Sequence, residues 1–94
     1  MGLFDRFKKK APTAEERRQE LLRTGRITDG LIIDTSTDAE GNEIAHYVYT
    51  LNGVDFESSE ILTERQLHDG AKYVAGAHIG VRYDQKNQGN STIE

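Results

Sequence analysis

Residues 43–62, EIAHYVYTLNGVDFESSEIL, hold two alternating apolar and polar segments on either side of an Asn-Gly pair. A two-residue type I′ turn needs a positive φ at both central positions, and Asn-Gly tolerates this best. The segment therefore predicts a β-hairpin that turns at Asn52-Gly53. Its register follows from the turn: Leu51 pairs with Val54, Tyr49 with Phe56 and Tyr47 with Ser58.

This register sorts the hairpin into two faces, because successive side chains of a strand point to opposite sides of a sheet. The predicted buried face carries these side chains: Tyr47, Tyr49, Leu51, Val54 and Phe56. The predicted solvent-exposed face carries three cross-strand pairs: Thr50 with Asp55, Val48 with Glu57 and His46 with Ser59. A hairpin with one apolar face needs further elements to bury that face.

The segments around the hairpin extend the β pattern. RITDGLIIDTS, residues 26–36, is rich in β-branched residues, and DAEGN after it supplies turn residues, so we expect a strand paired with residues 43–51. ERQLHDGAKYVAG, residues 64–76, combines a helical turn with two glycines and predicts a loop that crosses to the next strand. In that strand, AHIGVRYD, the inward side chains are Ile79, Val81 and Tyr83.

The two ends of the chain complete the expected domain. Thr13-Ala14-Glu15-Glu16 has the form of a capping box and predicts a helix from Thr13 to about Thr24, with Gly25 as its C-cap. Its apolar face is thin, so we expect it to dock through one edge or to remain loosely held. Residues 85–94 predict a polar tail with Ile93 pinned to the core.

The fold class that follows is mainly β (α+β). We expect a small twisted antiparallel sheet or partial barrel of four to five strands, with the N-terminal helix on its open side. The chain then divides into a basic amphipathic segment (1–12), a helix (13–25) and a β domain (26–94). Its 94 residues leave room for a single domain with one modest core.

Composition narrows the classes of function. Mean hydropathy is -0.70 and no apolar run approaches the roughly 20 residues that cross a bilayer. Because the N-terminus also lacks the apolar region of a secretory signal, we expect a cytoplasmic location. The absence of cysteine excludes disulfides, thiol catalysis and thiolate metal sites.

Charge is divided unevenly along the chain. Residues 1–26 carry eight bases and four acids, whereas the other 68 residues carry four bases and twelve acids. An acidic body repels nucleic acid, because such binding depends on clustered bases that neutralise phosphates. We therefore expect no nucleic-acid partner, and we expect any anionic partner to meet the N-terminal quarter.

Motifs for catalysis or metal binding are absent from the sequence. The histidines lack metal-ligand spacing, the serines lie in a strand without a sharp elbow, and no glycine-rich phosphate loop occurs. The residues weighed for these roles were His46, His68, His78, Ser58, Ser59, Asp55 and Glu57. We predict no catalytic residue, metal site or cofactor, and hence a protein that is not an enzyme. The tyrosines (Tyr47, Tyr49, Tyr73 and Tyr83) are expected in the core, with a ligand groove as the alternative.

A resemblance to a known family supports the β assignment. Three short motifs resemble the domain of unknown function 3592 family of small bacterial β modules: YVYTLNG (47–53), YVAG (73–76) and VRYD (81–84), followed by Asn87 and Ser91. That family usually has prolines near Gln85 and Gln88, which this chain lacks, so the closing turn is expected to be looser. The resemblance implies a membrane-proximal module without assigned catalytic residues.

The opening segment, MGLFDRFKKK, is the strongest functional signal. If residues 2–10 are helical, three apolar side chains share one face: Leu3, Phe4 and Phe7. Four bases flank them: Arg6, Lys8, Lys9 and Lys10. Burial of the apolar group contributes at most about 6 kcal/mol, the bases near an anionic leaflet add roughly 1 kcal/mol each, and ordering the segment costs on the order of 10 kcal/mol. Membrane attachment should be weak, reversible and salt-sensitive, unless homo-oligomerisation supplies several copies.

Several functions remain open for this segment. It could bind an anionic membrane surface at the inner face, dock on a protein partner or protomer, fold back onto the core or stay a flexible tail. The preferred hypothesis is a non-enzymatic β interaction module attached to a membrane or partner through Leu3–Lys10. The alternative is a ligand- or peptide-binding β module that uses its tyrosine-rich face or an exposed sheet edge.

Overall fold

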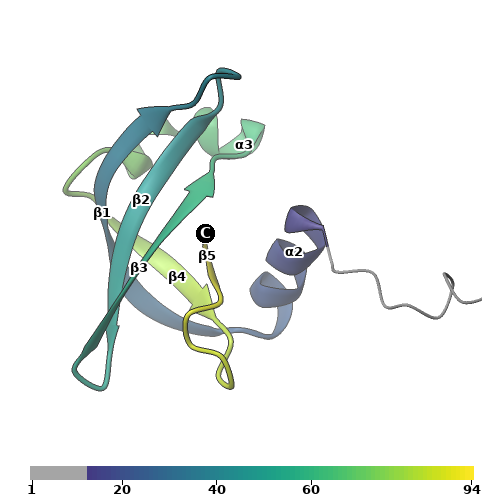
Figure 1. Ribbon diagram of the computed structural model, residues 1–94, viewed down its shortest axis with the longest axis vertical. Coiled ribbons are helices and arrows are strands. Elements are labelled where there is room, and N and C mark those ends of the chain that lie inside the picture. Colours follow the sequence, from purple (N-terminus) through teal and green to yellow (C-terminus); the bar gives the residue numbers. More distant parts are fainter. Residues whose placement is uncertain (1–12) are drawn as a thin grey trace, which may run out of the picture.

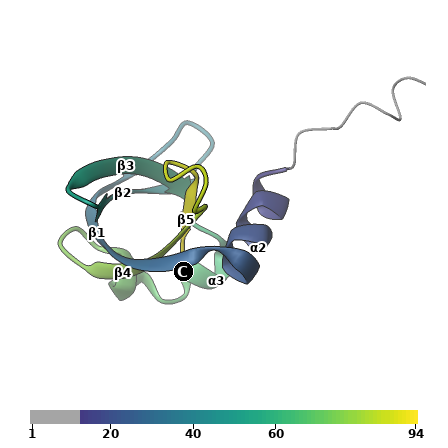
Figure 2. The same ribbon diagram turned by 90° about the horizontal axis from the view of Figure 1, so that it is seen from below.

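The computed structural model describes residues 13–94, and the candidate binding residues of the opening segment lie outside this described part. Five antiparallel strands form one sheet in the order β3-β2-β1-β4-β5. Figure 2 shows this sheet curled into a half-barrel, with the N-terminal helix outside it. The elements have these bounds: α2 Ala14–Thr24, β1 Arg26–Thr37, β2 Glu43–Leu51, β3 Val54–Ile61, α3 Glu64–Leu67, η1 Gly70–Tyr73, β4 His78–Tyr83 and β5 Ser91–Ile93. The predicted fold class is confirmed.

The β2–β3 hairpin has the predicted turn and register. Asn52 and Gly53 have φ values of 52° and 82°, as a type I′ turn requires. All six predicted cross-strand pairs, from Leu51 with Val54 to His46 with Ser59, are present. Two residues depart from predicted burial: Val54 is 54% exposed and Phe56 is partly buried. Val54 lies directly after the turn, at the end of the sheet, beyond the packed interior.

The central strand β1 gives the sheet its curvature. It pairs with β2 on one side and with β4 on the other, and its register with β2 shifts between Ile32 and Asp34. Such a bulge bends a strand and increases its twist. Gly30 lies in the same strand, where an added Cβ would stand 2.5 Å from Cγ2 of Val81. The curled sheet therefore requires glycine at this position.

The core fills the inside of the half-barrel. Its fully buried members include Ile32, Tyr47, Val81 and Ile93. The ring of Tyr49 stacks on three aromatic neighbours, with centroid distances of 6.1 Å to Tyr47, 5.4 Å to Phe56 and 6.3 Å to Tyr83. Tyr47, Tyr49 and Tyr73 are buried and Tyr83 packs against them, so the tyrosines are core material.

The C-terminal segment differs from the predicted polar tail. Residues Ser91–Ile93 form β5, which pairs antiparallel with β4 and is buried along its whole length. A turn reverses the chain before it, with the amide of Asp84 donating to the carbonyl of Asn90 at 3.0 Å. The prediction that Ile93 is pinned to the core is confirmed. The tail assignment is wrong, because long-range pairing gives these polar residues backbone partners.

Helix α2 begins and ends where the sequence predicts. The Thr13 hydroxyl accepts from the amide of Glu16 at 3.1 Å, and the Glu16 carboxylate accepts from the amide of Thr13 at 2.9 Å. Gly25 caps the other end in an extended conformation, and an added Cβ would stand 2.5 Å from the Leu21 carbonyl oxygen. The helix contacts β5 and β4, so it docks beside the open edge of the half-barrel (Figure 1).

Candidate functional site

Two consecutive arginines of α2 bind the last strand. The Arg17 Nη1 donates to the Asn90 side chain at 3.0 Å and to the Ser91 carbonyl at 2.8 Å. The Arg18 Nη1 donates to the Ile93 carbonyl at 2.6 Å and to the Thr92 hydroxyl at 3.0 Å. These hydrogen bonds and the buried side chain of Leu21 hold the helix against the sheet.

A carboxylate from β3 completes this cluster. Glu60 pairs with Ala45 across the hairpin and thus faces inward, and its side chain is 9% exposed. Its Oε2 accepts from the Thr92 hydroxyl at 2.6 Å and lies 3.3 Å from the Arg18 Nη1. Since β3 and β5 are the two edges of the sheet, Glu60 joins the edges that the strands leave unpaired. We call Arg17, Arg18, Glu60 and Thr92 the helix clasp.

Burial changes the acidity of the Glu60 carboxyl group. Desolvation raises its pKa above the usual value of 4.5, although the Thr92 hydroxyl and the two arginines act in the opposite direction. Its Oε1 has no hydrogen-bond partner within residues 13–94, and the Arg17 Nη2 approaches it only to 4.0 Å. The clasp therefore contains a partly satisfied ion pair, which makes it sensitive to the loss of either arginine.

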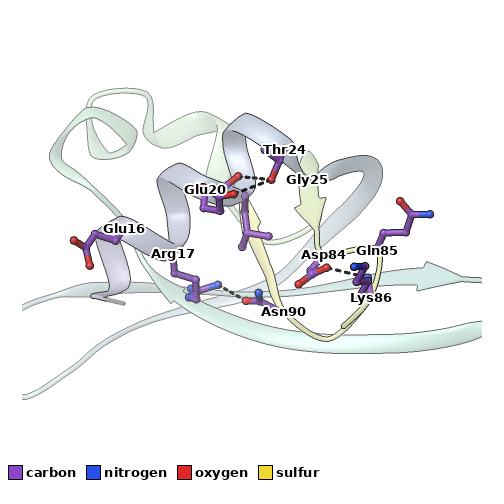
Figure 3. Close-up of a pocket in the computed structure, with 10 residues that line it drawn as sticks. Glu16, Arg17, Glu20, Thr24, Gly25, Asp84, Gln85, Lys86 and Asn90 are labelled. Atoms are coloured by element: carbon purple, nitrogen blue, oxygen red, sulfur yellow. Dashed lines mark hydrogen bonds between the residues drawn. The ribbon is translucent and has the colours of Figure 1, made fainter. Parts of the chain in front are cut away.

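A groove lies between α2 and the turn that precedes β5. It has a volume of about 450 Å³. Figure 3 shows Arg17 reaching across its floor to Asn90, and Asp84 bonded to the backbone of Lys86. The lining residues are Glu16, Arg17, Glu20, Leu21, Thr24, Gly25, Asp84, Gln85, Lys86 and Asn90. Glu16, Arg17, Glu20 and Asp84 each form hydrogen bonds within the protein.

His46 and His78 bond to neighbouring side chains on the outer side of the sheet, and His68 is exposed after α3. His46 lies between the hydroxyls of Ser36 and Ser59, at 2.9 and 2.8 Å, on the exposed side of the sheet. His78 contacts Asp29 at 3.1 Å. Within residues 13–94, no three side chains of the metal-ligating types lie close enough together to hold a metal ion.

Three further candidate residues, Asp55, Ser58 and Ser59, lie opposite polar or aromatic side chains in the hairpin. Asp55 accepts from the Thr50 hydroxyl at 2.6 Å on the exposed face of β3. Ser58 faces the core opposite Tyr47, whereas Ser59 faces out toward His46. The sequence placed His46 and Ser59 opposite each other; Ser36 was missed because the β1–β2 register depends on the bulge.

The sequence pattern did not predict the helix clasp. One signal was present, since the predicted register extends to Glu60 opposite Ala45 and thus puts a charge on the apolar face. A carboxylate at an inward position requires a buried partner. That rule would have pointed to Glu60, but it could not have identified the arginines that meet it.

Comparisons of the chain with protein-family models, with curated proteins and with solved structures find no match. The resemblance to the domain of unknown function 3592 family accordingly stays a prediction. In the part of the chain that the structure describes, none of the helices has the length and apolar character needed to cross a bilayer.

Proposed function

We propose that this protein is a non-enzymatic interaction module that attaches reversibly to an anionic membrane surface through residues 3–10. The observation that carries the proposal is the contrast between this segment and the domain after it. The segment holds four bases and three large apolar side chains, whereas residues 13–94 hold eight bases and fifteen acids. An anionic surface attracts the first and repels the second.

The physical basis of attachment is a weak combination of two forces. Leu3, Phe4 and Phe7 supply apolar area for the interfacial region of a bilayer, and the adjacent bases supply roughly 1 kcal/mol each near anionic lipid. The tyrosine rings of the domain do not compete for this role, because Tyr47, Tyr49 and Tyr73 are buried in its core and Tyr83 packs against that core. Attachment therefore depends on the segment and should weaken with salt.

The fold supports a tether at this position. The capping box fixes the chain at Thr13, and the helix clasp holds α2 against β5 through Arg17 and Arg18. A surface that binds residues 3–10 is thereby linked to the β domain through an ordered helix. This arrangement brings the acidic half-barrel to a membrane without requiring that the half-barrel contact it.

Co-sedimentation with anionic vesicles at low salt tests the proposal. The full chain should pellet, and a chain that lacks residues 1–10 should stay in the supernatant. Phe4→Ser with Phe7→Ser, and separately Lys8→Gln with Lys9→Gln, should each reduce pelleting. Lys86→Gln, which removes a base elsewhere, is the matched control and should pellet like the parent. Equal pelleting of the full and shortened chains would overturn the proposal.

A second candidate function is peptide binding at the edge of β3. This strand pairs with β2 and has no second strand partner in the described sheet. In a two-residue hairpin, alternate residues of each strand direct their backbone N–H and C=O groups away from the partner strand. In β3 these residues are Asp55, Glu57 and Ser59. An added strand would use these groups. Unchanged hydrogen-exchange protection of residues 54–61 with a candidate peptide present would count against it.

A further inference from the structure

The outer face of the sheet exposes a group of aliphatic side chains at its centre. Leu31 is 36% exposed and pairs directly with Val48, which is half-buried. Ile33, at the bulge of β1, is 45% exposed. The wet face of an antiparallel sheet is ordinarily polar. Three neighbouring aliphatic residues on two paired strands therefore form a surface to which an apolar ligand could bind.

Acidic side chains border this group. Glu57 pairs with Val48 on the side of β3, and Asp34 follows Ile33 in β1. Both carboxylates belong to exposed residues. We call Leu31, Ile33, Val48, Asp34 and Glu57 the outer-face patch. It combines apolar area with negative charge, so it is complementary to a ligand that combines apolar side chains with positive charge.

We propose that the outer-face patch binds residues 3–10 of the same chain. Phe4 and Phe7 would cover Leu31, Ile33 and Val48, while the lysines that follow meet the bordering carboxylates. This inference rests on the proposed function in one respect, since it takes residues 3–10 as the adhesive segment. It adds a second binding place for that segment, in competition with the membrane.

The length of the chain permits this contact. The start of α2 lies near the end of β3, because Ala14, Glu15, Ser59 and Ile61 line one groove of about 230 Å³. The distance from Ser59 to Glu57 along β3 is about 7 Å, and the next two strands, β2 and β1, each lie about 4.8 Å further across the sheet. The path is therefore about 17 Å. Six residues from Thr13 back to Phe7 span about 20 Å when extended.

Docking within one chain has an advantage over docking between chains. A short linker holds the segment at an effective concentration in the millimolar range. A contact too weak to form between separate molecules is then populated. Because the lysines meet carboxylates at the surface, the contact should weaken as salt screens these charges.

Paramagnetic relaxation measured by NMR tests this contact. The chain has no cysteine, so Gly2→Cys provides a single attachment point for a nitroxide. In the ¹⁵N-labelled full chain at low salt, the amide signals of Leu31 and Val48 should broaden more than that of Gly53 at the hairpin turn. Glu57→Gln should lower the bound-to-free ratio roughly two- to fivefold. Asp69→Asn, an exposed acid without a side-chain capping bond, is the matched control.

Vesicle binding supplies an independent readout. If membrane and sheet compete, Leu31→Thr with Glu57→Gln frees the segment and raises the pelleted fraction of the full chain. Val54→Thr with Asp69→Asn should leave that fraction unchanged. Unbroadened Leu31 and Val48 signals overturn the inference, as does broadening that appears only when spin-labelled and ¹⁵N-labelled chains are mixed. Broadening of Leu31 and Val48 in the parent, when the chain with Leu31→Thr and Glu57→Gln also fails to pellet, supports the inference and overturns the membrane proposal alone.

Discussion

Replacing Arg18 with methionine removes the guanidinium that joins α2 to both edges of the sheet. Methionine keeps an apolar stem like that of arginine and lacks the guanidinium, so the change isolates the charged group. Three contacts of the Arg18 Nη1 are lost, to the Ile93 carbonyl, the Thr92 hydroxyl and the Glu60 carboxylate. Glu60 then remains on the inner face without its nearest positive charge.

The expected cost follows from the burial of this pair. The side chains of Arg18 and Glu60 are 14% and 9% exposed. Removing one partner of a buried ion pair costs about 3–5 kcal/mol, mostly because the remaining charge is left uncompensated. Arg17 stays 4.0 Å from Glu60 and offsets part of the loss. We therefore expect the free energy of unfolding to fall by about 3 kcal/mol, at the low end of the range.

Urea denaturation followed by circular dichroism measures this change. With a denaturant slope of about 1 kcal/mol per molar urea, the unfolding midpoint should fall by roughly 2–3 M. Arg18→Met with Glu60→Gln should recover most of the loss, because it also removes the unpaired charge. Arg23→Met is the matched control on the same helix. Its side chain is 70% exposed, so its pair with Glu20 is worth less than about 0.5 kcal/mol.

Two outcomes would refute this reasoning. A loss below about 1 kcal/mol for Arg18→Met would mean that Glu60 is well solvated or that α2 contributes little to stability. A double variant no more stable than Arg18→Met would mean that the loss comes from the carbonyl and hydroxyl contacts. In either case the helix clasp would not act as a buried ion pair.

Two further predictions concern Glu60 and the hairpin turn. Burial raises the pKa of Glu60 above 4.5, so the folded state binds the proton of this carboxyl more tightly than the unfolded state does. Relative to Glu60→Gln, the parent should therefore gain stability as pH falls from 7 toward 4.5. Urea midpoints at each pH measure this gain, and parallel profiles of stability against pH for the two proteins would contradict it. Gly53 has a φ of 82° and nothing within 4 Å of an added Cβ, so Gly53→Ala should lose about 1 kcal/mol by backbone strain alone. Gly70→Ala, equally open but without positive φ, should change the free energy of unfolding by less than about 0.5 kcal/mol. Thermal melts of the two variants measure these losses, and equal losses at both positions would be inconsistent with strain.

Local signals account for the parts of the fold that the sequence predicted correctly. The Asn52-Gly53 turn sets the register of β2 and β3 because both strands start from the same two residues. The capping box sets the start of α2 because all of its atoms lie within four residues. Alternation in β4 and β2 likewise identifies the buried face, since it depends on the period of the strand alone.

The candidate site could not be predicted from local signals in the same way. The sequence directed attention to residues 3–10 and to surface histidines, while the helix clasp went unnoticed. Its hydrogen bonds join residues that are 73 to 75 positions apart, from Arg17 to Asn90 and Ser91, and from Arg18 to Thr92 and Ile93. Nothing in the neighbourhood of either arginine distinguishes it from a solvated helix charge.

The sequence by itself therefore determined the hairpin register, the helix limits and the division between a basic opening segment and an acidic domain. Each depends on residues close in the chain, where steric limits on φ and the two-residue period of a strand act directly. Only the tertiary structure decided that Ser91–Ile93 is a strand, that Glu60 is buried, and that two arginines join the sheet edges. Those outcomes depend on which distant segments meet when the sheet curls, because a charge or a short polar strand is stable in the interior only beside a complementary partner.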